Sequence, residues 1–289
     1  MNVVRPERKL RILNLLVEGN SIRSTERLTR THRDTIMRIL VAAGEKCRLF
    51  LDARMRNLQR EHWEIDEIWT FCRKKEGRLT AAEKATGIWG DQYLFLAVGL
   101  ETKVIPTFVL GKRTGDNART FMKDLAGRLR PGNPERHQLS TDGFSPYPDA
   151  VAEAFRHGTD YGVIIKNYHP DLVGPGRYGP PDMTAATRRV ICGTFDPKDI
   201  CTSHVERNNL TIRTFIKRYT RLTVAFSKKK LNLEAAISLH IAHYNFCWVH
   251  STLEQTPAQA AGLADARWPW RLDRLLEAAG VLDTDTYSW

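Results

Sequence analysis

The sequence predicts an α/β protein in which a mixed five-stranded sheet with helices follows a small all-α domain. The hydrophobic period is helical over residues 1–45, changes to short β-branched and aromatic segments from residue 62, and then alternates between helix and strand. At 289 residues and 42% apolar composition, the chain can build one large domain and one small one. We place a helical linker over 46–61, the α/β domain over 62–265 and a helical tail over 266–289.

Residues 1–45 contain three short helical patterns separated by turn signals. The first pattern ends at Gly19, a usual helix terminator, and Ser21 can cap the second. Thr31, with Asp34 three residues later, resembles a capping box and predicts the start of the third helix. A short helix, a tight turn and a second helix form a helix-turn-helix, so we expect that organisation here.

The first polar residues of the third helix face outward on this interpretation, where such motifs contact base edges and phosphates. The candidate DNA-binding residues here are His32, Arg33, Thr35 and Arg38. Residues 1–60 carry 14 basic and six acidic side chains, a net charge of +8, which favours double-stranded DNA as a partner. A three-helix cluster that only packs or dimerises is the alternative.

The α/β part begins with three segments that predict an antiparallel meander: "HWEIDEIWTF", "YLFLAVGL" and "KVIPTFVLGK". Further along, helices are expected over 115–130 and 147–157, and strands over 136–142 and 161–166. The Pro/Gly-rich segment 167–199 has neither period and predicts an irregular insertion, after which a helix begins near residue 203. This order of elements is that of the ribonuclease-H-like fold.

Three carboxylates are candidate metal ligands because of their positions in these strands and helices. Asp66 lies within the first strand, Asp142 follows the strand "HQLST", and Glu206 is in the first turn of the next long helix. If they converge within about 4 Å, they repel one another by several kcal/mol per pair and require cations. Mg²⁺ or Mn²⁺ prefers such oxygen ligands, and two ions can act together in displacement at phosphorus. Ordinary capping is the alternative for each carboxylate alone.

The segment 202–230 carries eight basic side chains and one acidic side chain, Glu206. On a helical wheel Asn209, Arg213 and Lys217 follow Glu206 along one face, while an apolar stripe occupies the adjacent face. The apolar stripe is expected to anchor the helix to the domain. The polar face therefore predicts three further DNA-binding residues next to a metal ligand.

Four blocks of this chain resemble the insertion-sequence-one type of bacterial DDE transposase: "WEIDEIWTF", "STDGFSPY", "SHVERNNLTIRTFIKRYTRLTVAFSKK" and "HYNFCWVHSTLEQTPAQAAGL". The resemblance covers about residues 62–265. It implies that Asp66, Asp142 and Glu206 are the catalytic residues and metal ligands. It also implies strand cleavage at element ends, strand transfer into target DNA, and a homodimer or larger assembly on DNA.

Two other functions share part of this pattern. A hydrolysis-only metal-dependent nuclease would use the same carboxylates, and a non-catalytic helix-turn-helix regulator would share the basic N-terminal region. Two sets of three possible zinc ligands are also present, although core packing is the favoured explanation of both. They are His240, His243 and Cys247, and Cys192, Cys201 and His204.

The remaining features concern the compartment. The five cysteines form no C-x-x-C pair, and an odd, scattered set favours reduced thiols. The longest apolar runs fall far below the roughly 20 residues of a membrane helix, and the first residues do not form a signal peptide. We therefore expect a cytoplasmic chain, associated with the nucleoid when bound to DNA, and no membrane partner.

Overall fold

The computed structural model describes residues 4–130, 136–156, 158–168, 183–194, 196–221, 223–265 and 269–282. These residues form an α/β structure with one mixed sheet of six strands in the order β3-β2-β1-β4-β5-β6. β1 is antiparallel to β2 and parallel to β4, while β6 lies antiparallel to β5 at one edge. The strands are β1 His62–Cys72, β2 Gly90–Gly99, β3 Phe108–Gly111, β4 His137–Thr141, β5 Thr159–Tyr168 and β6 Met183–Cys192.

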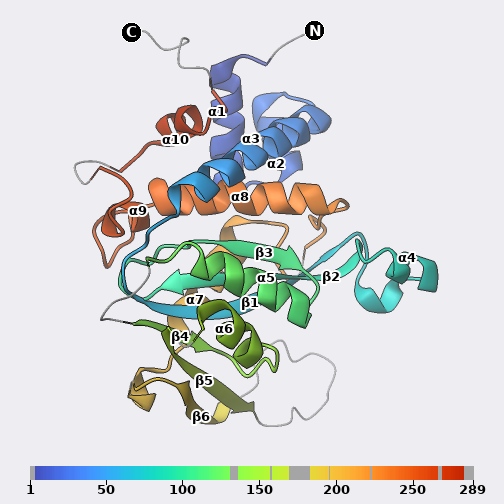
Figure 1. Cartoon of the computed structure of the whole chain (residues 1–289). Coiled ribbons are helices and arrows are strands. Elements are labelled where there is room, and N and C mark those ends of the chain that lie inside the picture. Colours follow the sequence, from blue (N-terminus) through green and yellow to red (C-terminus); the bar gives the residue numbers. More distant parts are fainter. Residues whose placement is uncertain are drawn as a thin grey trace.

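Helices cover both faces of the sheet (Figure 1). The helices of the described residues are α1 Pro6–Val17, α2 Ile22–Thr29, α3 Arg33–Arg54, α4 Ala81–Ala85, α5 Gly115–Ala126, α6 Tyr147–Phe155, α7 Ser203–Phe215, α8 Lys230–Phe246, α9 Pro257–Ala260 and α10 Leu272–Ala278. α5 and α6 lie on one face, and α7 packs against β1 and β2 from the other. α8 lies between the sheet and the N-terminal helices.

The N-terminal helices and the sheet share one hydrophobic core through α8. The Phe50 ring of α3 packs edge-on against Phe246 of α8, with ring centroids 5.0 Å apart. At the same end of α8, the side chain of the adjacent Asn245 accepts from the backbone N–H of Ile105 and donates to its carbonyl oxygen, at 3.0 and 2.9 Å. α8 therefore connects α3 to the loop that joins β2 and β3.

The third helix is longer than expected, because α3 continues through residue 54 and includes most of the predicted linker. Its buried residues repeat at helical spacing from Ile36 to Leu51, so the side that packs on α8 has no break at residue 45. The predicted cap is also corrected. His32, rather than Thr31, is the N-cap, and its side chain accepts from the backbone N–H of Asp34.

The sixth strand corrects the prediction of a five-stranded sheet with an irregular segment over 167–199. β6 pairs with β5 by backbone hydrogen bonds at an edge, with Val163 opposite Arg189. An edge strand needs little apolar surface, so "TAATRRV" does not show the pattern of a buried strand. Residues 169–182 lie outside the described residues.

Two other expectations are only partly met. The predicted strand "KVIPTFVLGK" is paired only over β3, since Pro106 cannot donate to a ladder. In the predicted tail, α10 is the described helix, whereas 266–268 and 283–289 lie outside the described residues. No helix in the described part of the chain has both the length and the apolar character needed to cross a membrane.

Gly44→Ala is expected to destabilise the chain. A Cβ on Gly44 would lie 2.4 Å from the Ala235 backbone, so α3 and α8 would have to separate. Alanine favours an isolated helix by up to about 1 kcal/mol, but overpacking costs about 1–3 kcal/mol. Urea unfolding measures the net loss. Gly77→Ala is the control, since its Cβ would meet no atom within 4 Å, and equal stability of the two variants would contradict the prediction.

Candidate functional site

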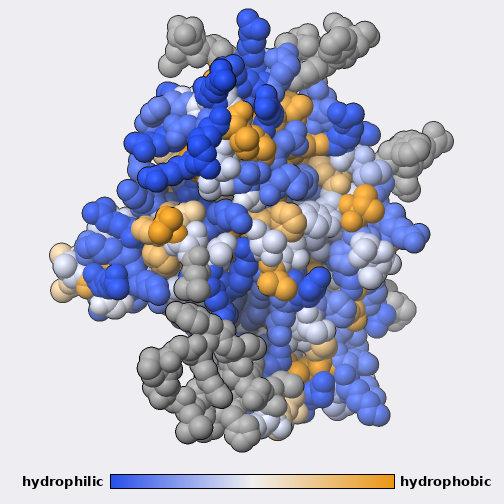
Figure 2. Space-filling view, turned by 180° about the vertical axis from the view of Figure 1, so that it is seen from behind, coloured by the Kyte–Doolittle hydropathy of each residue, from blue (hydrophilic) through white to orange (hydrophobic). Residues whose placement is uncertain are grey.

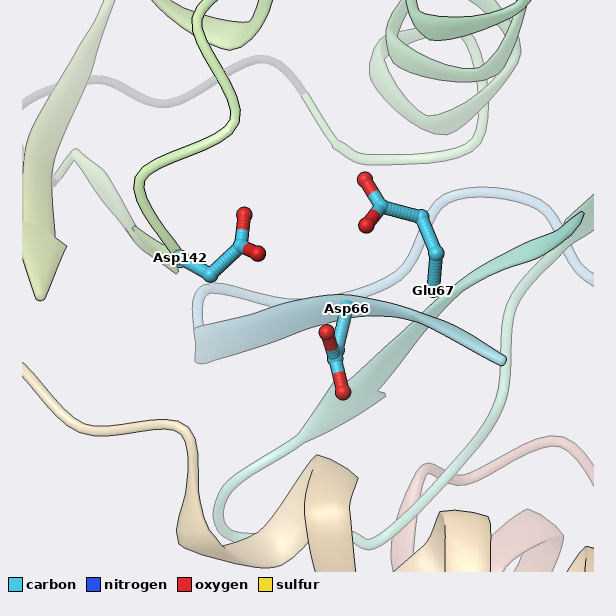
Figure 3. A group of neighbouring side chains, drawn as sticks. All are labelled: Asp66, Glu67 and Asp142. Carbon is cyan, nitrogen blue, oxygen red and sulfur yellow. The ribbon is translucent and has the colours of Figure 1, made fainter. Parts of the chain in front are cut away.

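An acidic group lies where β1 passes the end of β4. The parallel register of these strands runs to the pair Ile65 and Thr141, so the residues that follow, Asp66 and Asp142, lie beside one another. Asp66, Glu67 and Asp142 each offer one carboxylate oxygen within 4.8 Å of the others. Figure 3 shows Asp66 and Glu67 on opposite sides of β1, with Asp142 approaching from the loop after β4. The structure thus brings together two of the three predicted ligands.

Glu67 is the member of the group that the sequence analysis missed. Its side chain is only 3% exposed, and its Oε1 has no partner of standard hydrogen-bond geometry among the described residues, although the Tyr147 hydroxyl is near enough to lower its pKa. A second acid beside Asp66, in a strand with helices on both faces, is the signal that could have identified it. Buried carboxylates are costly unless they are paired, so this position requires a positive charge or a proton.

The electrostatics of the acidic group favour protonation in the absence of an added cation. Burial, together with the negative charges of Glu67, Asp142 and Glu206, raises the pKa of Asp66 to about 7. Burial likewise raises the pKa of Glu67 to about 7, assisted by the charge of Asp142 and opposed by Arg113. Three carboxylates without a histidine or cysteine form a donor set that suits Mg²⁺ or Mn²⁺.

Arg113 supplies a positive charge to this site. Its Nη2 lies 3.1 Å from Glu67 Oε2 and 3.2 Å from Asp142 Oδ2, so one guanidinium pairs with both carboxylates. The guanidinium also lies over the Phe144 ring, 4.2 Å from the centroid. Arg113 follows β3 in the chain and reaches the acidic group across β2. The sequence analysis did not single it out.

Glu206, the third predicted ligand, lies in the first turn of α7 but outside the 4.8 Å group. Its Oε1 pairs with Lys166 Nζ of β5 and accepts from Thr202 Oγ1 at 2.7 Å. It is nevertheless near enough for its charge to raise the pKa of Asp66. Lys166 therefore neutralises Glu206 in the same way that Arg113 neutralises Asp142.

A buried carboxylate positions α7. Glu64, two residues before Asp66 in β1, is fully buried and accepts from the backbone N–H groups of His204 and Val205 at 2.7 and 3.1 Å. His204 Nδ1 lies 2.8 Å from its other oxygen. The first N–H groups of a helix have no partner inside the helix and attract negative charge. Glu64 thus fixes the start of α7 on β1.

The three polar residues predicted to follow Glu206 have different surroundings. Asn209 is buried and donates from Nδ2 to Asp66 Oδ2 at 2.7 Å, so it holds a carboxylate of the acidic group. Arg213 Nη1 donates to the Tyr219 carbonyl oxygen at 3.0 Å. Lys217 is exposed beyond the helix, because α7 ends at Phe215 and the backbone becomes extended at Ile216. The prediction of a polar helical face that continues to Lys217 is therefore wrong beyond Arg213, because the helix ends at Phe215.

The four candidate DNA-binding residues of the N-terminal region lie at the start of α3. His32, Arg33 and Arg38 are exposed and Thr35 is half-buried, with Arg38 Nη2 donating to Thr35 Oγ1 at 3.2 Å. Glu26 of α2 accepts from the Arg33 backbone N–H at 2.9 Å, which ties the two helices together at this turn. These side chains can therefore reach an external partner.

The two zinc patterns are not assembled by the fold. Within the described residues, the acidic group is the one set of three or more metal-binding side chains with all ligand atoms within 4.8 Å of one another. Neither His240, His243 and Cys247 nor Cys192, Cys201 and His204 forms such a set. Burial lowers the pKa of His240 to about 3, as expected of a neutral ring packed in a core.

Comparison with known proteins does not identify the chain. No protein-family model matches it, and no curated protein matches it.

Glu67→Gln is expected to weaken the pH dependence of stability. The pKa of Glu67 is about 7 in the folded chain against an ordinary value of 4.5, so the folded chain retains a proton that the unfolded chain has lost between these values. Stability therefore falls as pH rises across that window, and a neutral amide removes this part of the fall.

The measurement is the free energy of urea unfolding at pH 4.5 and pH 8. Asp66 contributes a fall of the same sign, so the slope should decrease in Glu67→Gln without vanishing. Asp116→Asn, at a side chain that is 95% exposed, is the control and should leave the slope unchanged. The same slope in Glu67→Gln and in the unaltered chain would contradict the assignment.

Proposed function

We propose that this chain is a metal-dependent DNA transposase that cleaves DNA at element ends and transfers the freed strand into target DNA. The observation that carries the proposal is the acidic group, in which Asp66 and Asp142 lie side by side where β1 passes the end of β4. This is where an open α/β sheet places a ligand, beyond the carboxyl end of a parallel strand. The resemblance to DDE transposases assigns these same two aspartates to catalysis.

The arrangement of strands supports a ribonuclease-H-like catalytic domain. Three antiparallel strands, β1 to β3, are followed by β4 and β5 in parallel, with β1 and β4 adjacent at the centre. This arrangement agrees with the order of elements on which the expectation rested. A ribonuclease-H-like domain would place its catalytic carboxylates at the centre of the sheet, where Asp66 and Asp142 lie.

The net charge of +8 on residues 1–60 supports DNA as the partner. Figure 2 shows a face of the molecule on which hydrophilic residues, acidic and basic alike, predominate. The start of α3 adds exposed His32, Arg33 and Arg38, and a helix-turn-helix formed by α2 and α3 would present them to a DNA groove. The resemblance to DDE transposases, whose reaction joins two DNA ends, leads us to propose that a homodimer or larger assembly forms on DNA.

The residues of the site have distinct roles in this proposal. Asp66, Asp142 and Glu67 would hold Mg²⁺ or Mn²⁺, with Glu206 available at the edge of the site. The cations, when bound, activate the attacking hydroxyl and stabilise the leaving oxygen. Asn209 orients Asp66 through its amide, and Glu64 keeps α7 at the distance that this contact needs. Arg113 pairs with Asp142 and Lys166 with Glu206, and a bound cation would compete with these two side chains for the carboxylates.

Asp142→Asn should abolish strand cleavage and strand transfer while leaving DNA affinity nearly unchanged. It removes a charged ligand at which several kcal/mol of transition-state stabilisation are expected, so the rate should fall about a hundredfold or more. The assay uses labelled element-end DNA with Mg²⁺, both uncut and pre-cut, and anisotropy measures DNA binding. Asp149→Asn, at an exposed residue of α6, is the control.

The outcomes separate the proposal from its rivals. A hydrolysis-only nuclease would cut DNA but give no joined product from pre-cut ends, and a non-catalytic regulator would bind DNA and do neither. Unchanged cleavage by Asp142→Asn would remove Asp142 from the mechanism.

Arg113→Gln and Lys166→Gln should each bind Mn²⁺ more tightly than the unaltered chain. A positive charge about 5 Å from a bound cation opposes it by about 1–3 kcal/mol, so a gain of about tenfold is expected. Calorimetry in the absence of DNA measures the affinity. Arg119→Gln, which removes the same charge from the pair with Glu153 and Asp116, is the control. Weaker Mn²⁺ binding by the two variants would contradict this prediction. It would show that Arg113 and Lys166 position the carboxylates for the metal rather than compete with it.

A further inference from the structure

A row of aromatic rings continues from the acidic group along β1 and β2. Side chains alternate along a strand, so Glu67, Trp69 and Phe71 share one face of β1. Tyr93 of β2 lies opposite Trp69 in the register. Ring centroids are 5.9 Å apart for Trp69 and Phe71, and 5.0 Å apart for Phe71 and Phe226. We call Tyr93, Trp69, Phe71 and Phe226 the aromatic row.

The rings of the aromatic row are less buried than the aromatic residue that follows them on this face of the sheet. Phe95, opposite Glu67, is 0% exposed and packs near Phe121 of α5 and Tyr147 of α6. By contrast, all four rings of the aromatic row are partly exposed. The row therefore presents apolar surface beside the acidic group, and such surface in a polar frame marks a binding site.

Cations lie over the faces of these rings. Lys75 Nζ is 5.7 Å from the centre of Trp69, and the Arg113 guanidinium carbon is 6.0 Å from that of Tyr93. Nearby, Arg73 lies 4.1 Å over Trp89 in the arm that carries α4. The charged end of exposed Lys75 stays in water, so its place over Trp69 indicates a ring face that a ligand can also reach, whereas Arg113 is held near Tyr93 by its pairs with Glu67 and Asp142.

Exposed cations flank the row, while Asp91 of β2 lies opposite Phe71 and Glu67 lies at the other end of the row. Lys75, Lys228 and Lys229 are exposed, and no acidic side chain within the described ranges forms an ion pair with them. The segment with Lys228 and Lys229 meets the end of β1, since Ser227 forms a bridge with Cys72 and its carbonyl oxygen accepts from the Arg73 backbone N–H. Phosphates can thus be bound on either side of the rings.

We propose that the aromatic row binds unpaired nucleotides of a DNA strand. Flat apolar faces framed by cations fit a chain of phosphates and bases, because any base can stack on an aromatic ring. A duplex hides its base faces within the stack, so it would use the cations alone. The row lies next to Glu67, so a phosphate near the bound nucleotides would lie at the acidic group. Only this last point rests on the proposed function.

Binding of two DNA ligands without divalent cations tests the inference. One ligand is a blunt duplex, and the other is the same duplex with a five-nucleotide thymidine tail. Trp69→Leu and Phe71→Leu should lower affinity for the tailed duplex about fivefold or more, as expected for the loss of a stacked base, and leave blunt-duplex affinity unchanged. Phe155→Leu, at a half-buried ring of α6 outside the row, is the control. Equal affinity of all variants for the tailed duplex would overturn the inference.

A second measurement uses the unaltered chain and so does not depend on how well the variants fold. Photocrosslinking to a tail that contains 5-iodouracil should give adducts at Trp69, Phe71, Tyr93 or Phe226. Adducts confined to other residues would overturn the inference.

Both measurements omit divalent cations, which separates this inference from the proposed function. A chain that binds the tailed duplex through the row but has no cleavage activity would refute the transposase proposal alone. A chain that cleaves and joins DNA, with affinity for the tail unaffected in the row variants, would refute the aromatic row alone.

Discussion

The site depends on the buried carboxylate of Glu64. It satisfies two N–H groups at the start of α7, and these contacts link residues about 140 positions apart in the chain. Without partners, a buried carboxylate would be strongly unfavourable, so the contact constrains both β1 and α7. Because α7 begins at this point, Asn209 reaches Asp66 and Glu206 comes close enough to act on it electrostatically.

The negative charges of the site are partly neutralised by basic side chains of the same chain. Arg113 arrives from the end of β3 and pairs with Glu67 and Asp142, whereas Lys166 arrives from β5 and pairs with Glu206. Asp66 has an amide partner instead of a cation, and its pKa rises to about 7 because it is buried among the other acids. Without an added cation, the carboxylates of this site are therefore held by Arg113, Lys166 and Asn209.

Two surfaces of different chemistry take part in the proposal, and only the aromatic row adjoins the acidic group. The exposed residues at the start of α3 suit a duplex, whose phosphates and groove edges are available to polar side chains. The aromatic row suits bases that have left the stack. α8 holds the first surface against the sheet through the shared core, and β1 carries the second as a direct continuation of Glu67.

Local patterns were enough to locate β1 to β5, most helices and the positions of Asp66, Asp142 and Glu206, because strand and helix periods depend on neighbouring residues. The transposase assignment itself stays a prediction. Glu64, Glu67, Arg113 and Lys166 acquire their roles only through sheet register and helix docking, which join residues about 30 to 140 positions apart. β6 escaped the sequence analysis for the same reason, since an edge strand is defined by the partner it pairs with rather than by its own apolar pattern.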